Sequence, residues 1–458
     1  MNDVRPLAPW YWRSIPLQER TGAEIFQALF GQAKIATLLE SPYPTPVDYP
    51  HLARYSLCAG KVRNPHGQAS YLTPAIGHIF TTLRQLLQRP YAPADVPEHL
   101  PFQGGWLGWF GYDAAWEIES LPYLKQDQLP FPVAYWYEPE NFAILDHQDQ
   151  RLWLATSEPQ AGEMLLAKLT AADDQAPGPE KIQPISLSYG ISQTQYEAMV
   201  NQAKVYIQQG DIFQANLSLR FQGPTAQPAW PIYRRLQAIN PSPFASYWRT
   251  PWGEVVSCSP ERLVQLTGQQ AQTRPIAGTR PRGQSLTEEK QFQQDLRQNL
   301  KERAEHIMLV DLERNDLGRV CQWGSVEVDE FLALERYSHV LHLVSNVRGT
   351  LRADQDAIDL LQAMFPGGTI TGCPKVRCME IIEELEPVRR SLFYGSCGYL
   401  DQRGHLDLNI LIRTLLFTQG QVIGQVGAGI VADSDPQREW WESLQKAKAQ
   451  LSALGLRV

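Results

Sequence analysis

Three strand-like segments follow one another near the C-terminus and restrict the fold more than any other feature: "YGSCGYLD", "LDLNILIRTLLF" and "QVIGQVGAGIVAD". The three segments follow one another in meander order. The segment "GEVVSCSPERLVQLTGQQAQTRPIAGTR" predicts two more strands with a turn near Gly268. Such a meander, mixed with helices, favours an α+β fold over a doubly wound sheet.

The clearest helix signal lies in the middle of the chain. Ser192 and Gln195 form a possible capping box, apolar residues keep helical spacing up to Ile207, and Gly210 ends the run. Further helices are predicted over residues 286–317, over "VRCMEIIEELEP" before Pro387, and from Asp435 and Pro436, which suit N-cap and N1 positions.

Length and composition limit the class of protein. The 458 residues allow two or three domains, and the Pro- and Ala-rich stretch 171–184 is the best linker, dividing an N-terminal region (1–185) from a catalytic region (186–458). A net charge of -8 without a basic block argues against nucleic acid or an anionic membrane as partner. No signal peptide or spanning segment is evident, and six cysteines without a C-x-x-C pair indicate reduced thiols, so a cytoplasmic location is expected.

The loop "FPGGTITGCPK" (365–375) precedes a predicted helix and could hold an anion on its backbone N–H groups. Gly367 and Gly372 have the spacing of a nucleotide-binding loop. However, Cys373 and Pro374 intervene before Lys375, whereas that motif places Lys directly after the last Gly. The anion therefore has to be identified from the rest of the chain.

Two pairs of glutamates are candidates for a metal site. Glu302 and Glu305 share one helix face, as do Glu439 and Glu442. If the helices meet, four carboxylates converge, and Mg²⁺ prefers such oxygen ligands. The alternative is a pair of solvated helix faces, but Trp440 and Trp441 between the second pair indicate packing.

Other candidates are glycine turns that a ligand can approach closely, at Gly278 with Thr279 and at Gly427 with Gly429. Arg413 lies in an apolar segment and needs a planar carboxylate partner, either structural or from a ligand. Three further residues are candidates. Glu261 could act as a general acid, and His339 is either a titrating group or a packed strand residue. The third is Thr369 in the glycine loop.

Nine motifs occur in a characteristic order: "GDIFQANLSLRF", "SPERLV", "RPIAGTRPRG", "DLERNDLGRV", "HVLHLVSNVRG", "FPGGTITGCPKVRCMEIIEELEP", "GSCGYL", "LNILIRT" and "GAGIVADSDPQREWWES". Together they resemble the chorismate-utilising enzymes over residues 190–458, and "LLESP" (38–42) extends the resemblance toward the N-terminus. The resemblance implies two packed antiparallel sheets with helices outside, and a ring diacid, chorismate, as substrate.

The resemblance also implies a role for each candidate. Mg²⁺ would be held by Glu305 and Glu442, with Glu302 and Glu439 holding its waters. Substrate contacts would come from Gly278, Thr279 and Lys446 for the ring carboxylate, from Tyr399, Arg413, Gly427 and the nearby Gly429 for the enolpyruvyl carboxylate, and from Thr369 for the ring. Glu261 would protonate the departing C4 hydroxyl, and His339 would assist pyruvate elimination where that occurs.

The nucleophile follows from one position. Isochorismate-forming relatives carry a water-activating lysine where this chain has Gln214, so ammonia is the expected nucleophile. No glutaminase nucleophile is present, so a separate glutaminase subunit or free ammonium would supply it.

The motifs "GGTITG" and "LNILIRT" are most similar to component I of aminodeoxychorismate synthases, which serve 4-aminobenzoate and folate synthesis. Ala277, where some members carry a nucleophilic lysine, and His339 keep component I of anthranilate synthases, which release anthranilate and pyruvate, as the alternative. Ser41 in "LLESP" matches a tryptophan-binding part of the family, either regulatory or a relic.

Overall fold

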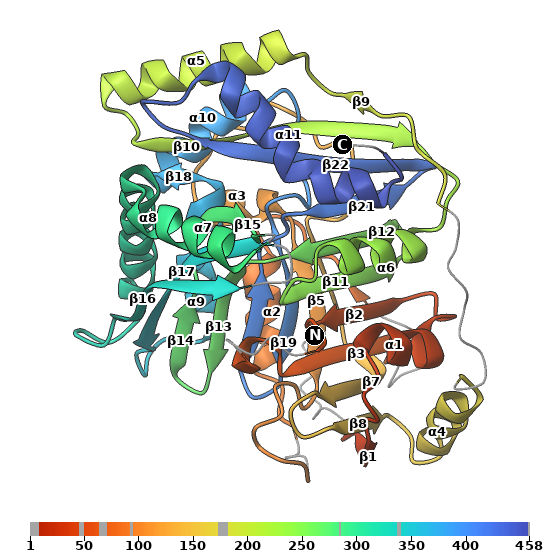
Figure 1. The fold of residues 1–458 in the computed structure, drawn as a ribbon. Coiled ribbons are helices and arrows are strands. Elements are labelled where there is room, and N and C mark those ends of the chain that lie inside the picture. The colour runs from red at the N-terminus through yellow and green to blue at the C-terminus, as the bar shows by residue number, and fades with distance from the viewer. Residues whose placement is uncertain are drawn as a thin grey trace.

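The computed structural model describes residues 9–44, 50–63, 71–91, 95–172, 182–283, 285–336 and 340–456. Two antiparallel sheets, one of 12 strands and one of 10, form most of the molecule (Figure 1). This confirms the expected α+β architecture of two antiparallel sheets with helices.

The 12-stranded sheet runs in the order β1 (Tyr11–Pro16), β8 (Arg151–Thr156), β7 (Pro139–Asp146), β3 (Tyr55–Val62), β2 (Ala36–Glu40), β11 (Phe244–Thr250), β12 (Gly253–Ser259), β21 (Thr414–Thr418), β22 (Gln421–Ile430), β10 (Gln214–Pro224) and β18 (Gly372–Cys373), with β9 (Ser188–Tyr189) paired to β10. The 10-stranded sheet runs β15 (Ile276–Pro281), β17 (Val340–Thr350), β14 (Gln270–Thr273), β13 (Arg262–Thr267), β20 (Leu406–Asn409), β19 (Ser396–Asp401), β5 (Gly105–Phe110), β6 (Ala134–Tyr137) and β4 (Tyr71–Leu72), with β16 (Glu327–Arg336) paired to β17. Strands from both sides of the expected linker enter each sheet, so the two regions share one architecture.

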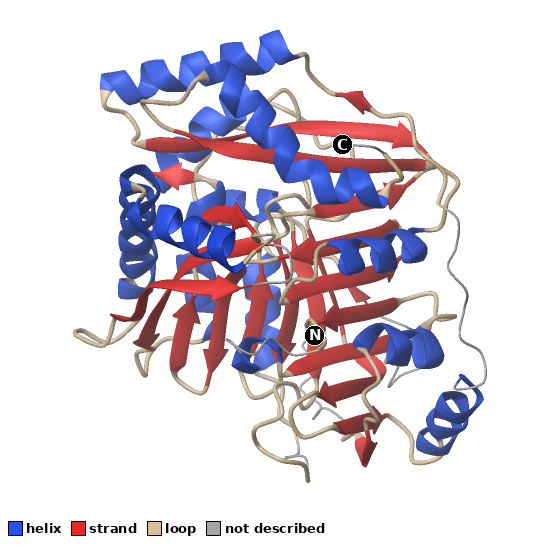
Figure 2. Cartoon of the chain, in the orientation of Figure 1, coloured by secondary structure: helices blue, strands red, loops and turns tan. Residues whose placement is uncertain are grey.

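The helices lie around these sheets (Figure 2). They are α1 (Gly22–Phe30), α2 (Ile79–Leu87), α3 (Ala115–Ile118), α4 (Ala161–Ala172), α5 (Gln193–Gln209), α6 (Ala229–Ile239), α7 (Leu286–Gln298), α8 (Leu300–Gly318), α9 (Ala357–Met364), α10 (Lys375–Leu385) and α11 (Pro436–Ala453), with a short 3₁₀ turn, η3, at Gly368–Ile370. Helices α1, α6 and α11 follow one another along one face of the 12-stranded sheet, and α8 packs on β15 and β17. Within the described residues, no helix is long and apolar enough to cross a membrane.

Strand alternation explains why both faces of the larger sheet are apolar. Val255 packs into the core between the sheets, whereas its neighbour Val256 packs under the outer helices. Leu416 and Leu415 divide in the same way. Because successive side chains of a strand point to opposite faces, one sheet serves two cores.

The local helix signals are confirmed. The side chain of Ser192 caps α5 in a capping box with Gln195, and Gly210 ends the helix with φ +83°. Helix α11 begins at Pro436 behind the N-cap Asp435, whose side chain accepts a hydrogen bond from Arg438 N.

Three sequence expectations were wrong in detail. The helix expected over 286–317 is broken at Asn299, which has extended ψ and whose side chain caps α8. The single strand expected over "LDLNILIRTLLF" is two strands, β20 and β21, which belong to different sheets. The two strands expected around Gly268 are four, although the turn at Gly268 is present with φ +60°.

Candidate active site between the two sheets

Arg413 stands where the chain crosses from one sheet to the other, between β20 and β21, with φ +53°. Its position at a crossover, and not inside a strand, corrects the sequence expectation. Among the residues that the structure describes, Arg413 forms no ion pair with a carboxylate. Burial lowers the pKa of its guanidinium, and the nearby Tyr394 and Glu261 oppose that shift. This arginine can therefore receive a ligand carboxylate.

Glu261 lies at the start of β13 and is only 6% exposed. Burial raises the pKa of its carboxyl to about 7, although interactions with Thr369 and Arg413 lower it. The hydroxyl of Thr369 makes no hydrogen bond of good geometry within the described part of the chain, so it contributes as a nearby dipole. A carboxyl with such a pKa can donate a proton near neutrality.

His342 on β17 is a functional candidate that sequence reasoning missed. Its Nδ1 lies 3.0 Å from Oγ1 of Thr279. Burial and the charge of Arg413 lower its pKa to about 4, so the imidazole is neutral near pH 7. His339, the histidine chosen from the sequence, lies outside the described residues. The signal that could have found His342 is its place near the start of the strand that the sequence itself predicts.

Gly278 and the first turn of α8 meet at one side of the site. Gly278 has φ +73°, and a Cβ there would lie 2.7 Å from Oε2 of Glu302. Glu302 in turn pairs with Arg280, whose Nη1 lies 2.9 Å from its Oε1. The glycine therefore allows the turn and the carboxylate to approach each other.

The start of β10 lies beside the end of β22, where the side chain of Gln214 packs closely over Gly429. Asn216 of β10 pairs with Gly429 of β22, and a Cβ at Gly429 would lie 2.3 Å from Nε2 of Gln214 and 3.5 Å from Oε1 of Glu305. Nε2 of Gln214 donates to Oε1 of Glu305 at 3.2 Å. At Gly427 a Cβ would lie 2.4 Å from the carbonyl oxygen of Leu217, so strand packing alone accounts for that glycine.

The second pair of glutamates lies on α11, which packs on β22. Glu439 is 5% exposed, whereas Glu442 is 54% exposed and pairs with Lys446 at 2.9 Å. Within the described ranges, the predicted glutamates do not form a group of three with ligand atoms within 4.8 Å of one another. Their hard carboxylate oxygens are still the donor type that Mg²⁺ takes, usually one or two at a time with waters completing the shell.

A different group does meet that criterion: His99, Asp146 and Asp149. The guanidinium of Arg54 already pairs with both aspartates, at 2.8 Å to Asp146 and 3.0 Å to Asp149. A cation in contact with both carboxylates opposes a second one, so we assign no metal to this group.

Lys375 settles the question of a nucleotide loop. Its Nζ contacts Oδ2 of Asp316 at 2.5 Å and the carbonyl oxygen of Met364 at 3.3 Å. The lysine is thus engaged by α8 and α9 beneath the loop, and it does not extend toward a phosphate in the manner of a nucleotide-binding lysine.

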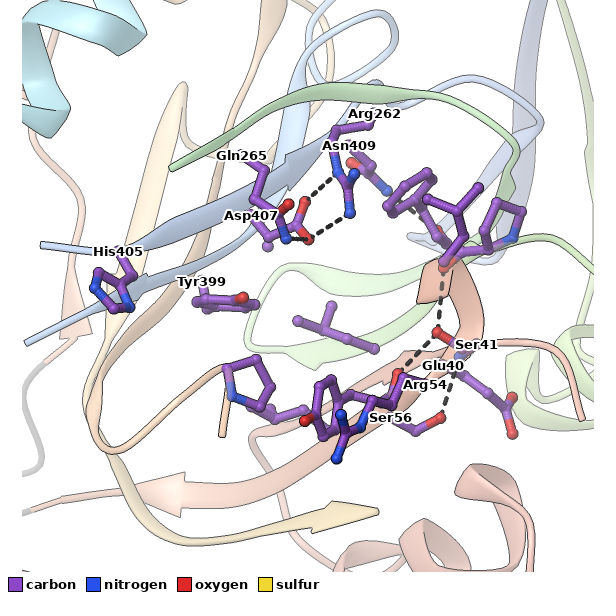
Figure 3. Close-up of a pocket in the computed structure, with 18 of the residues that line it drawn as sticks. Glu40, Ser41, Arg54, Ser56, Arg262, Gln265, Tyr399, His405, Asp407 and Asn409 are labelled. Atoms are coloured by element: carbon purple, nitrogen blue, oxygen red, sulfur yellow. Dashed lines mark hydrogen bonds and ion pairs between the residues drawn. The ribbon is translucent and has the colours of Figure 1, made fainter. Parts of the chain in front are cut away.

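Tyr399 and Ser41 line a cavity (Figure 3), and neither Arg413 nor Tyr394 is among its lining residues. The expectation that Tyr399 accompanies Arg413 therefore needs correction, since the tyrosine near Arg413 is Tyr394. Oγ of Ser41 donates to the carbonyl oxygen of Tyr55 at 2.7 Å, and Arg262 of β13 pairs with Asp407 of the neighbouring β20 at 2.9 Å on another wall of the cavity. Apolar walls and a few oriented polar groups fit a small amphipathic ligand.

The chain is similar to several known proteins. The family model of chorismate binding enzymes matches residues 59–452. A Synechocystis protein called anthranilate synthase component I-like is 66% identical, covering 99% of this chain and 93% of the relative. Aminodeoxychorismate synthase component 1 of Bacillus subtilis is 45% identical over 78% of each chain, and anthranilate synthase component 1 of Thermus thermophilus is 39% identical over 99% and 98%.

Among solved structures, anthranilate synthase component I from Streptococcus pneumoniae superposes with a TM-score of 0.74 at 31% identity, covering 87% of this chain and 92% of that one. The isochorismate synthase MenF from Escherichia coli has a TM-score of 0.71 at 18% identity, covering 98% and 95%, and supports the fold alone. The chain belongs to the chorismate-binding enzyme family.

Proposed function

We propose that this chain catalyses the Mg²⁺-dependent amination of chorismate by ammonia. The observation that carries the proposal is the proximity of Glu261, a buried carboxyl with a pKa of about 7, to Arg413, which forms no ion pair with a carboxylate among the described residues. An acid beside an arginine without a structural carboxylate suits a substrate that carries a carboxylate and loses a hydroxyl group.

Each side chain then has a defined task. Arg413 binds the enolpyruvyl carboxylate, and Gly278, Thr279 and Lys446 are assigned to the ring carboxylate. Glu261 gives its proton to the departing C4 hydroxyl, which leaves as water while the lone pair of ammonia forms the new C–N bond. The resulting ammonium group then returns one proton to the Glu261 carboxylate, so atoms and charge balance.

Glu305 and Glu442 are assigned to hold Mg²⁺, with Glu302 and Glu439 placing its waters. When bound, a dication at this position would neutralise the ring carboxylate and so favour attack by a nucleophile. Arg280, which pairs with Glu302, would hold that carboxylate in position. A glutaminase subunit or free ammonium would deliver the ammonia.

Two products remain candidates, and each has a specific observation in its favour. Of the three relatives compared by sequence, one is called an anthranilate synthase component and one anthranilate synthase component I-like. Their names support release of anthranilate and pyruvate better than formation of 4-amino-4-deoxychorismate. The neutral His342 beside the site is a base that could remove the ring proton for that step. The loop "GGTITG" and the 45% identical Bacillus subtilis relative favour 4-amino-4-deoxychorismate.

One incubation with chorismate, Mg²⁺ and ammonium separates the products. Fluorescent anthranilate with an equal amount of pyruvate would establish the first product. A non-fluorescent product that yields 4-aminobenzoate only after an aminodeoxychorismate lyase is added would establish the second. Unchanged chorismate at all ammonium concentrations would contradict both.

For the cavity lined by Ser41 and Tyr399 we propose binding of tryptophan as an effector. Its support is the combination of Ser41 and Tyr399 with apolar walls from Leu57 and Phe244. The ligand would act as a regulator and not as a substrate, since neither Glu261 nor Arg413 lines this cavity.

A further inference from the structure

A second carboxyl group is buried near Glu261. Glu313 on α8 is 5% exposed, and among the described residues it forms no ion pair. Asp316, one turn further along the same helix, contacts Nζ of Lys375 at 2.5 Å. Two neighbouring carboxyls that share one cation cannot both ionise cheaply in a buried site. The proton of this pair therefore stays on Glu313, the member that does not contact the lysine.

The hydroxyl of Thr273 on β14 requires the same protonation state. Glu313 and Thr273 share a side-chain hydrogen bond. Oγ1 of Thr273 donates its own proton to the carbonyl oxygen of Leu263 at 2.8 Å. A hydroxyl has one proton to donate, so toward Glu313 it can only accept. Glu313 is then the donor, which an ionised carboxylate cannot be.

This chain of hydrogen bonds ends in the strand that Glu261 precedes. Leu263 is the second residue of β13, which begins directly after Glu261. On another side the carboxyl faces the glycine loop, because a Cβ at Gly368 would lie 3.4 Å from Oε1 of Glu313. The next residue of that loop, Thr369, interacts with Glu261. Glu313 thus borders both segments that surround the general acid.

Burial and the neighbouring charges agree with a protonated Glu313. Burial raises the pKa of its carboxyl above the usual range, the charges of Asp316 and Glu261 raise it further, and the charge of Lys375 lowers it. These three residues are the charged groups that face the carboxyl, from α8, from the link before β13 and from α10.

We propose that Glu313 is a positioning residue that works as a neutral carboxylic acid, donating its proton to Thr273 and thereby holding the start of β13, and with it Glu261, in place. Its neutrality has a second consequence. When Glu261 gives up its proton, the carboxylate that forms meets no negative charge from Glu313, so the proton is released more readily. The inference rests on the proposed amination, in which Glu261 is the general acid.

The first test is steady-state kinetics of amination at saturating ammonium and Mg²⁺, from about pH 6 to about pH 8. Glu313→Gln keeps a donor for Thr273 and cannot ionise, so its kcat should stay within about threefold of wild type and should fall at the same pH to within about half a unit. Glu313→Met has a similar volume but no donor. It should lower kcat about tenfold, the value of one hydrogen bond, and change the KM for chorismate less than about twofold.

Thr273 provides the matched variants. Thr273→Ser keeps the hydroxyl and should behave like wild type, whereas Thr273→Val removes it and should repeat the loss seen with Glu313→Met. Because both residues belong to one chain of hydrogen bonds, the double variant should lose no more activity than either single variant. If Glu313→Met does not fold, the comparison of Ser with Val at position 273 decides the question.

Three kinetic results would overturn the inference. One is a Gln variant as slow as the Met variant, which would mean that a neutral donor is not what the site needs. Another is a Gln variant whose kcat falls at a clearly lower pH than in wild type, because removal of a negative charge beside Glu261 has that effect. The third is a double variant whose losses simply add.

Infrared absorption tests the protonation state without turnover. At neutral pH, the difference spectrum between wild type and Glu313→Gln should contain the band of a protonated carboxyl, and a carboxylate band in its place would refute the inference. Wild-type protein that does not consume chorismate with ammonium would refute the proposed amination, whatever the infrared result. Wild-type protein that aminates chorismate, with kcat indifferent to both Glu313→Met and Thr273→Val, would refute only the role of Glu313.

Discussion

Glu261 and Arg413 reach the same site from two different connections between the sheets. Glu261 lies on the link from β12 to β13, directly before β13, and Arg413 lies on the link from β20 to β21. Both links cross from one sheet to the other, so the site is built where the chain changes layers. Burial raises the pKa of Glu261, the charge of Arg413 lowers it, and the pKa of this carboxyl is about 7 because burial has the larger effect.

Replacing Glu261 by Gln should reduce kcat by about a hundredfold or more, the usual contribution of a positioned general acid. The KM for chorismate should change little, because Arg413 and the glycine turns still bind the substrate. Initial rates with ammonium and Mg²⁺ provide the measurement. A Gln variant with more than half of the wild-type kcat would remove Glu261 from the mechanism.

The pH dependence follows from the same carboxyl. The acid must be protonated to act, so kcat at saturating ammonium should fall as pH rises through about 7. Saturating ammonium at every pH is essential, because free ammonia itself increases with pH. The measurement runs from about pH 6 to about pH 8, roughly one unit on each side of that pKa. A kcat that stays level or rises over this range would contradict the assignment.

The raised pKa of Glu261 also affects stability. The folded state holds the proton more tightly than the unfolded state, so stability is complete below the unfolded pKa of 4.5 and is lost as pH rises through about 7. The full difference corresponds to about 3 kcal/mol. Urea unfolding of wild type and Glu261→Gln should show a smaller loss with rising pH in the variant, and parallel curves would refute this linkage.

Replacing Arg413 by Lys should raise the KM for chorismate by about tenfold to a hundredfold, because an ammonium group cannot replace a bidentate guanidinium. The KM for ammonium should stay near the wild-type value. Equal chorismate KM values for Arg413→Lys and wild type would show that this arginine does not bind a substrate carboxylate.

The substitution Gly429→Ala tests the close packing of Gln214 over Gly429. The added Cβ would lie 2.3 Å from Nε2 of Gln214, so the amide must move and its contact with Glu305 is lost. We expect at least a tenfold loss of kcat/KM, the approximate value of one lost hydrogen bond. Gly318→Ala is the control, because nothing lies within 4 Å of a Cβ there, and equal activity of the two variants would argue against a close ligand site at Gly429.

Much of the fold could be predicted from the sequence because its signals are local. The capping box of α5 and the N-cap of α11 depend on residues three positions apart, and both are where the sequence indicates. The break at Asn299 was not predictable in this way, because the residues on either side continue a helical pattern. The crossing of the chain at Arg413 also depends on tertiary packing, since "LNILIRTLLF" has one continuous apolar pattern.

The candidate site was only partly accessible to sequence reasoning. Glu261, Arg413 and Gly429 were identified by residue type and motif, and their roles in the site stay predictions. Tyr394 and His342, which lie near Arg413, were not among the residues chosen from the sequence, because a motif does not show which side chains lie near one another in the fold. The side-chain carbonyl oxygens of Gln214 and Asn216 are buried without a hydrogen-bond donor among the described residues, and only the folded structure reveals this.

The most direct test of the account is mass spectrometry of the product formed from chorismate, Mg²⁺ and isotope-labelled ammonium. We predict that wild-type protein consumes chorismate and that one labelled nitrogen appears in a ring product, whereas Glu261→Gln forms far less of it. A product without nitrogen, or no consumption of chorismate by folded protein with Mg²⁺ and excess ammonium, would contradict the account.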